Sequence, residues 1–106
     1  MATGRLGVSA IPATTLTTVY TVPSGIYTVC NVSITNRNAT TVKVRLAMAT
    51  SATPNAQEYI EYDTVIVGNG VFERTGLVLN AGLNIVVYSD TASVGCTVYG
   101  IETSTT

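Results

Sequence analysis

The stretch Tyr59-Ile-Glu-Tyr-Asp-Thr-Val-Ile-Val67, Gly68-Asn-Gly70, Val71-Phe-Glu-Arg-Thr-Gly-Leu-Val-Leu79 decides how the rest of the chain is interpreted. It predicts a long strand, a glycine-bracketed turn and a second strand that returns beside the first as a hairpin. The two glycines are expected to supply the positive φ angles of a tight reversal. Three of the six acidic residues of the chain and one of its five basic residues also lie here, so this hairpin is the first candidate for a contact surface.

The first strand of this hairpin carries two different patterns. Ile60 and Tyr62 alternate with Glu61 and Asp63, as expected for a strand that is buried on one face only. The following run, 65–67, is apolar at every position, which predicts burial on both faces.

The composition predicts an all-β protein. Of the 106 residues, 46% are hydrophobic and only 10% are charged, and the sequence is rich in threonine, a β-branched residue that favours strands. This length is sufficient for a single domain, residues 1–106, with one hydrophobic core.

Further strands are expected at residues 16–22, 27–35, 41–48, 84–89 and 94–101. Alternation directs Thr28, Cys30, Val32 and Ile34 to the core from the second of these segments, and Val42, Val44, Leu46 and Met48 from the third. The second and third segments are expected to pair as a hairpin. Seven or eight short strands predict an antiparallel two-sheet β-sandwich, with a jelly-roll or an immunoglobulin-like strand order.

The two ends of the chain are predicted to lie outside the sandwich. Two glycines in the first seven residues suggest a flexible N-terminal arm over about residues 1–10, which orders only against a neighbour. The polar residues 102–106 are expected to form a frayed C-terminal tail.

Charge and hydropathy argue against several classes of partner. The formal net charge is −1 and the five basic residues are scattered, which argues against nucleic-acid binding. No apolar run is long enough for a membrane span, and the N-terminus lacks the apolar core of a signal peptide. Cys30 and Cys96 are either a disulfide between the two sheets or two buried free thiols, and the missing export signal favours free thiols.

The sequence offers little material for catalysis or for a cofactor. It has no histidine, the usual general base and transition-metal ligand, and two cysteines cannot complete a zinc site. Carboxylates at positions 58, 61, 63 and 73 are candidates for a glycosidase pair or a calcium site. The alternative is a solvated strand face on which Lys43, Arg45 or Arg74 pairs with them, and this alternative is favoured. We therefore expect no enzyme activity, no cofactor and no metal site.

The six tyrosines admit two interpretations. In a chain without tryptophan they serve first as large packing residues. Tyr27 and Tyr99 fall on predicted outward faces, where they would suit a protein interface or a sugar.

Several short motifs occur together in one order: Gly4-Arg-Leu-Gly7, Tyr20-Thr-Val-Pro23, Tyr59-Ile-Glu-Tyr-Asp63, Gly70-Val-Phe-Glu-Arg-Thr-Gly76, Leu79-Asn-Ala-Gly82 and Val98-Tyr-Gly-Ile-Glu102. Through them the chain resembles, over nearly its full length, a family of small virion proteins of tailed bacteriophages, including phages of cyanobacteria and marine bacteria.

The resemblance implies a non-enzymatic capsid decoration (cement) protein on the exterior of the virion, assembled in the host cytoplasm. Such a protein binds the outer surface of the major capsid protein lattice and stabilises it, here as an expected homotrimer without nucleic-acid or membrane partners. The alternative is a tail, baseplate or fibre component that recognises a glycan of the host surface. The candidate contact residues are Arg5 and Leu6 in the arm and Glu61, Asp63, Glu73 and Arg74 in the hairpin.

Overall fold

The computed structural model describes residues 2–105, which form strands and a single 3-10 turn. The elements are β1 (Thr3–Ile11), β2 (Thr17–Thr21), β3 (Ile26–Asn36), β4 (Val42–Ala49), η1 (Ala56–Glu58), β5 (Tyr59–Ile66), β6 (Val71–Leu79), β7 (Asn84–Ser89) and β8 (Val94–Ser104). The all-β prediction is confirmed.

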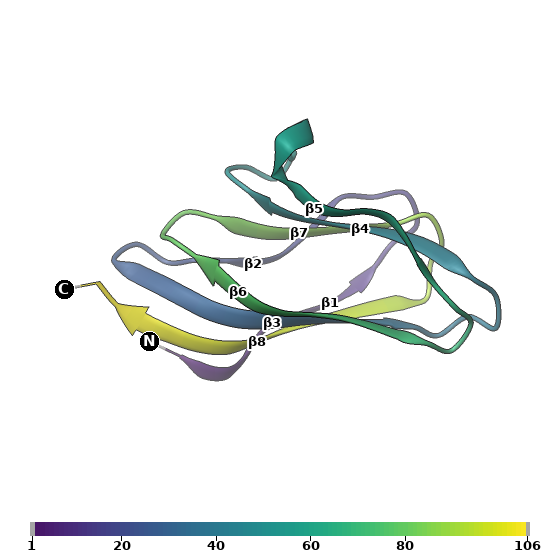
Figure 1. Ribbon diagram of the computed structural model, residues 1–106, viewed down its shortest axis with the longest axis horizontal. Coiled ribbons are helices and arrows are strands. Elements are labelled where there is room, and N and C mark those ends of the chain that lie inside the picture. The colour runs from purple at the N-terminus through teal and green to yellow at the C-terminus, as the bar shows by residue number, and fades with distance from the viewer. Residues whose placement is uncertain (1, 106) are drawn as a thin grey trace.

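The strands form two antiparallel four-stranded sheets that face each other (Figure 1). Sheet A has the order β1-β8-β3-β6, and sheet B has the order β2-β7-β4-β5. β1 pairs with β8, β2 with β7, β3 with β6 and β4 with β5, as in a long antiparallel ribbon wound into two layers. This is the strand order of a jelly roll, which decides between the two orders left open by the alternation.

The predicted hairpin at residues 59–79 is wrong. β5 is an edge strand of sheet B and β6 is an edge strand of sheet A, so the 68–70 turn carries the chain from one sheet to the other. The two strands fill the core from opposite sides, β5 with Ile66 and β6 with Leu77 and Leu79. β3 and β4 likewise lie in different sheets, so the second predicted hairpin is also wrong.

The side chain of Asn36, at the end of β3, holds this crossing in place. Its Nδ2 donates hydrogen bonds to the carbonyls of Thr40, Ile66 and Val67 at 2.9, 3.2 and 3.0 Å, and the residue is fully buried. A Cβ on Gly68 would lie 2.1 Å from the Ala39 carbonyl oxygen, so this glycine permits close packing of the two loops.

The predicted positive φ angles at Gly68 and Gly70 are absent, and Asn69 between them has the left-handed conformation, with φ 59°. Asparagine tolerates this region because its short polar side chain bonds locally. The predicted burial of the 65–67 run on both faces is also wrong, because Val65 and Val67 are exposed and only Ile66 points into the core.

Both chain ends are part of the sandwich rather than extensions of it. The predicted arm is wrong for residues 3–10, which belong to β1 and pair with β8. The predicted tail is wrong for residues 102–104, which continue β8 beside β3. The Glu102 N–H donates to the Ala2 carbonyl at 2.9 Å, so the two ends bind each other directly. Positions 1 and 106 of those predictions lie outside the described residues.

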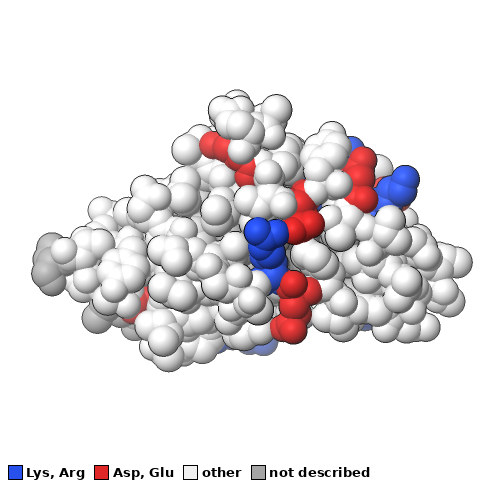
Figure 2. Space-filling view, viewed as in Figure 1, with Lys and Arg blue, Asp and Glu red and all other residues white. Residues whose placement is uncertain are grey.

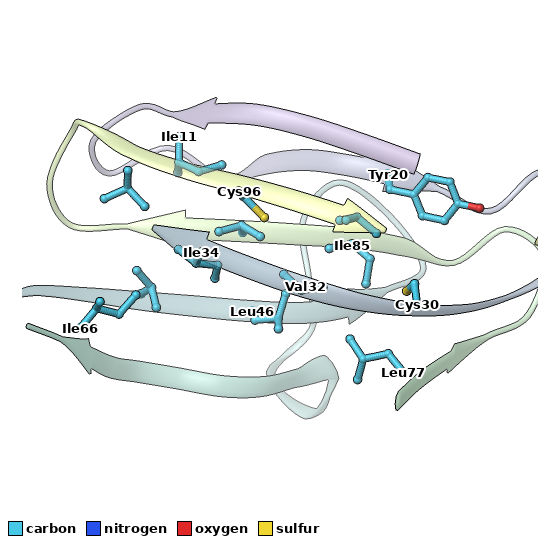
Figure 3. Close-up of a cluster of buried hydrophobic side chains, with 14 of the residues drawn as sticks. Ile11, Tyr20, Cys30, Val32, Ile34, Leu46, Ile66, Leu77, Ile85 and Cys96 are labelled. Atoms are coloured by element: carbon cyan, nitrogen blue, oxygen red, sulfur yellow. The ribbon is translucent and has the colours of Figure 1, made fainter. Parts of the chain in front are cut away.

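One hydrophobic core fills the space between the sheets (Figure 3). The predicted inward positions of β3 and β4 all contribute to it, with Met48 only partly buried. Ala47 alternates with the inward residues of β4 and is buried on the outer side of sheet B beneath Tyr59. Cys30 and Cys96 are free and buried, as favoured from the sequence, and both belong to sheet A.

Candidate functional site

The surface formed by residues 2–105 has no pocket and no group of three or more potential metal-binding side chains. Within the same residues no helix is long and apolar enough to cross a membrane. On the face drawn in Figure 2 most of the surface is uncharged, and basic and acidic side chains lie next to each other in the centre and at the upper right. Any site on this molecule must therefore be built from its exposed side chains, and its sheet faces, edges and turns are the places to examine.

Glu61 and Arg74 face each other across one side of the sandwich. Arg74 Nη1 donates to Glu61 Oε2, and this ion pair joins β5 of sheet B to β6 of sheet A. Thr64 Oγ1 donates to the other oxygen of the same carboxylate at 2.8 Å. The predicted pairing of these charges is confirmed, because the carboxylate and the guanidinium bind each other across the two sheets.

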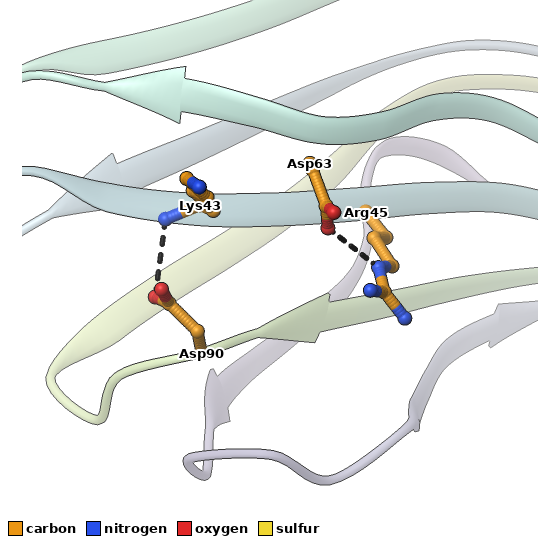
Figure 4. A network of polar contacts seen from close by, with 4 residues as sticks. All are labelled: Lys43, Arg45, Asp63 and Asp90. Carbon is orange, nitrogen blue, oxygen red and sulfur yellow. Dashed lines mark hydrogen bonds and ion pairs between the residues drawn. The ribbon is translucent and has the colours of Figure 1, made fainter.

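Asp63 lies in a different environment from Glu61, so the expectation that they share one strand face is wrong. Tyr62 and Asp63 form a bulge opposite Arg45 of β4, and Asp63 has a φ of 53°. Arg45 Nε donates to Asp63 Oδ1 at 2.7 Å (Figure 4). This hydrogen bond lowers the pKa of the Asp63 carboxyl below its ordinary value.

Arg45 also stacks on two aromatic rings, which the sequence did not reveal. Its guanidinium carbon lies 4.1 Å from the ring centre of Tyr62 and 4.8 Å from that of Tyr88. Tyr59 meets Tyr62 edge to face, with ring centres 5.2 Å apart. We call Tyr59, Tyr62, Tyr88 and Arg45 the tyrosine cluster. A second register shift, between Tyr59 and Glu61, places Glu61 opposite Leu46 and so brings Tyr62 to the face of Arg45. A two-residue alternation cannot signal such a shift.

Of the remaining predicted contact residues, Glu73 and Leu6 already make contacts within residues 2–105, and the guanidinium of Arg5 makes no polar contact there. The Tyr99 hydroxyl donates to Glu73 Oε2 at 2.8 Å, and this bond raises the pKa of Tyr99. Leu6 packs against the core and is partly buried, which leaves little of it for a partner. Arg5 is exposed, and its guanidinium has no hydrogen bond or ion pair to any other residue in the described range.

All four edge strands have an irregular register. The pairings of β1, β2, β6 and β5 with their inner neighbours each contain a register shift. The two pairings between inner strands, β3 with β8 and β4 with β7, are continuous. Bulges disturb the row of free backbone groups that another strand would pair with. A partner is therefore expected at a sheet face or a turn rather than at an edge.

Three valines flank the turn between the sheets. Val65, Val67 and Val71 are 56%, 64% and 59% exposed, and we call them the valine tip. They lie beside the loop crossing that Asn36 and Gly68 hold together. Register places Val65 on the outer face of sheet B and Val71 on the outer face of sheet A, so the tip exposes apolar side chains on both sides of a fixed turn. A fixed backbone lowers the entropy lost when a partner binds.

No protein-family model, curated protein or solved structure matches the chain. Its function is therefore argued from the surface described above and from the resemblance of its motifs.

Proposed function

We propose that this protein is a non-enzymatic structural protein of a virion that decorates the outer surface of the major capsid protein lattice and stabilises it. The valine tip carries this proposal, since exposed apolar side chains around a turn with a fixed backbone are suited to contact with a protein partner. The resemblance to small phage virion proteins supports the same conclusion, and it implies a homotrimer on the capsid exterior.

The chemistry of the molecule suits this role. A protein that stays on a particle needs a stable scaffold and contacts that do not depend on strand exchange. The bulged edges of both sheets supply the second property. Each subunit buries only a modest area, and several linked subunits bind far more tightly than one.

Copy number tests the location. Quantitative mass spectrometry of purified virions gives the ratio of this protein to the major capsid protein. A ratio near one, or a simple fraction of one, is the expected result for a decorated lattice. A few copies per particle would assign the protein to the tail, and its absence from virions would refute both locations.

Substitution tests the tip. Val67→Asp places a charge at the centre of the proposed contact and is expected to reduce binding to capsids that lack the protein by at least tenfold. Ser24→Asp, at an exposed turn between β2 and β3, adds the same charge elsewhere and is the matched control. Equal binding by the two folded variants would refute the tip as the contact.

The tyrosine cluster favours a second candidate, a tail or fibre component that binds a host-surface glycan. Tyr62 is 59% exposed, and aromatic rings beside Arg and Asp side chains offer both stacking and hydrogen bonds to a sugar. If the protein is such a component, the isolated chain is expected to bind host cells or a glycan array, and Tyr62→Ala is expected to abolish this binding. Tyr27→Ala, at another exposed tyrosine, is the control. Failure of the wild-type protein to bind any glycan or cell would exclude it.

A further inference from the structure

The outer face of sheet A carries few charged residues. Register places Ile101 of β8, Val29 of β3 and Val78 of β6 side by side across three neighbouring strands. These three side chains, which we call the apolar row, are 53%, 43% and 62% exposed. The other outward positions of this face include Thr, Ser, Asn and Gly together with the exposed Val8, Val71 and Tyr27. Such a row is larger than the isolated exposed apolar residues that monomers usually carry.

Two charged residues lie on this face, at its opposite edges. Arg5 is on β1, level with Tyr99, and Glu73 is on β6, level with Ser33. Tyr99 pairs with Asn31, which is two residues from Ser33 in β3. Arg5 and Glu73 therefore lie at nearly the same height along the strands. The Tyr99 hydroxyl holds the Glu73 carboxylate at 2.8 Å, whereas Arg5 has no partner within residues 2–105.

We propose that a second copy of this chain packs on the outer face of sheet A around a two-fold axis that runs parallel to the strands. Such a rotation exchanges the two edges of the sheet, so that β1 of one copy lies over β6 of the other. Arg5 then meets the partner's Glu73, and the contact occurs twice. The same rotation lays Ile101 over the partner's Val29.

The charges select this axis over the other in-plane axis. A two-fold axis perpendicular to the strands would lay β1 over β1 and β6 over β6. It would bring Arg5 toward Arg5 and Glu73 toward Glu73, and like charges in an interface cost several kcal/mol. Only the parallel axis makes the face complementary to itself, as a two-fold interface requires.

The area is sufficient for a specific dimer. Four strands about 4.8 Å apart and about nine residues long at about 3.3 Å each cover roughly 19 by 30 Å. That is about 600 Å² for each partner, which is the low end of specific protein interfaces. Bulges in the two edge strands of sheet A disfavour edge-to-edge pairing, so two copies are expected to associate through the face of the sheet.

Charge reversal tests the proposal in solution. Sedimentation equilibrium of the wild-type chain is expected to give twice the 11.0 kDa chain mass. Arg5→Glu and Glu73→Arg each place like charges together and are expected to weaken the dimer at least tenfold. The double variant Arg5→Glu with Glu73→Arg restores opposite charges and is expected to recover the dimer.

The apolar row has its own variant and control. Val29→Asp is expected to give a folded monomer, and Val65→Asp, at a similarly exposed valine of sheet B, a dimer. A monomeric wild type, a mass of three chains, or a dimer unaffected by the single charge reversals would overturn the proposal. A mass of three chains would agree instead with the homotrimer that the resemblance implies. Capsid binding through the valine tip is measured separately, so the dimer and the capsid contact can each fail while the other stands.

Discussion

Arg74 and Glu61 join the two sheets along the side of the sandwich where β5 and β6 lie, although thirteen positions separate them in the sequence. The opposite side is closed differently. There a Cβ on Gly7 of β1 would lie 2.3 Å from the Val19 carbonyl oxygen of β2, so the two backbones are in close contact. An ion pair links the edge strands on one side of the molecule. On the other side the backbones of the edge strands are in direct contact, which Gly7 permits because it has no side chain.

The ion pair is expected to contribute little to stability. The two side chains are 42% and 22% exposed, and a pair of this kind is worth about 0.2–1 kcal/mol. A double-mutant cycle with Arg74→Met and Glu61→Gln, measured by urea unfolding, should give a coupling energy in that range. The coupling should shrink as salt is added. A coupling above about 2 kcal/mol would show that this side depends on the pair.

The glycines of β8 predict opposite effects of the same substitution. A Cβ on Gly100 would lie 2.1 Å from the Val29 carbonyl oxygen, whereas a Cβ on Gly95 meets nothing within 4 Å. Gly100→Ala should therefore destabilise the fold by about 1–3 kcal/mol, the usual cost of overpacking. Gly95→Ala should stabilise it by about 0.5 kcal/mol, because alanine loses less backbone entropy in a strand. Thermal unfolding of both variants checks the two signs together.

Asn36 is expected to be the most sensitive polar residue of the core. Its Nδ2 serves three carbonyls and its Oδ1 accepts the Asn38 N–H at 2.9 Å. Asn36→Asp keeps the shape but replaces the donor with an acceptor, which leaves buried carbonyls unpaired at about 1–3 kcal/mol for each group lost. The free energy of unfolding in urea measures the loss. Asn38→Asp, at a half-buried neighbour, should cost less, and equal costs would contradict the role assigned to Asn36.

A polar network at the other end of the core predicts acid sensitivity. The Tyr20 hydroxyl donates to Glu102 Oε2 at 2.5 Å and lies 2.8 Å from Thr28 Oγ1. The bond to Tyr20 lowers the pKa of Glu102, so the folded state favours the ionised carboxylate. This contribution is complete above the ordinary pKa of glutamate and is lost as the pH falls through the lower pKa of the folded state.

Tyr20→Phe isolates that contribution. It should lower stability at neutral pH, since it leaves two polar groups without their partner, at about 1–3 kcal/mol. It should also flatten the decline of stability at acid pH. Melting temperatures of the two proteins across acid pH give the comparison, and parallel curves would show that the hydroxyl does not act on Glu102. Tyr27→Phe, on an exposed ring, is the control.

The alternation of side chains predicted which residues form the core but not which strands are neighbours. Thr28, Cys30, Val32 and Ile34 all face inward as expected, because burial on one face of a strand is a local property of the pattern. The predictions of the two hairpins are wrong because the residues of a turn do not determine whether the next strand joins the same sheet. Here the crossing is held by the Asn36 side chain through bonds to residues some thirty positions away, which no local sequence pattern signals.

The candidate site was predicted less well than the core. Its residues were correctly expected to form ion pairs across strands, and the pairs Arg45–Asp63 and Arg74–Glu61 are present. Their separation into two environments follows from the bulge at Tyr62 and Asp63, which moves every later side chain of β5 by one position. The pattern wrongly predicts burial of Val65 and Val67, because an apolar run near a crossing between sheets has the same composition as a run in the middle of a sheet.

The place of β8 in sheet A has a consequence for synthesis. β8 follows the other seven described strands in the chain, yet it lies between β1 and β3, the first and third of them. Until it is available, β1 has no partner in its sheet and the core lacks Val94, Cys96 and Val98. The newly made chain must therefore keep its apolar strands from other chains until β8 has been synthesised. Folding then begins with contacts between distant parts of the sequence, which is the slow regime for small β proteins.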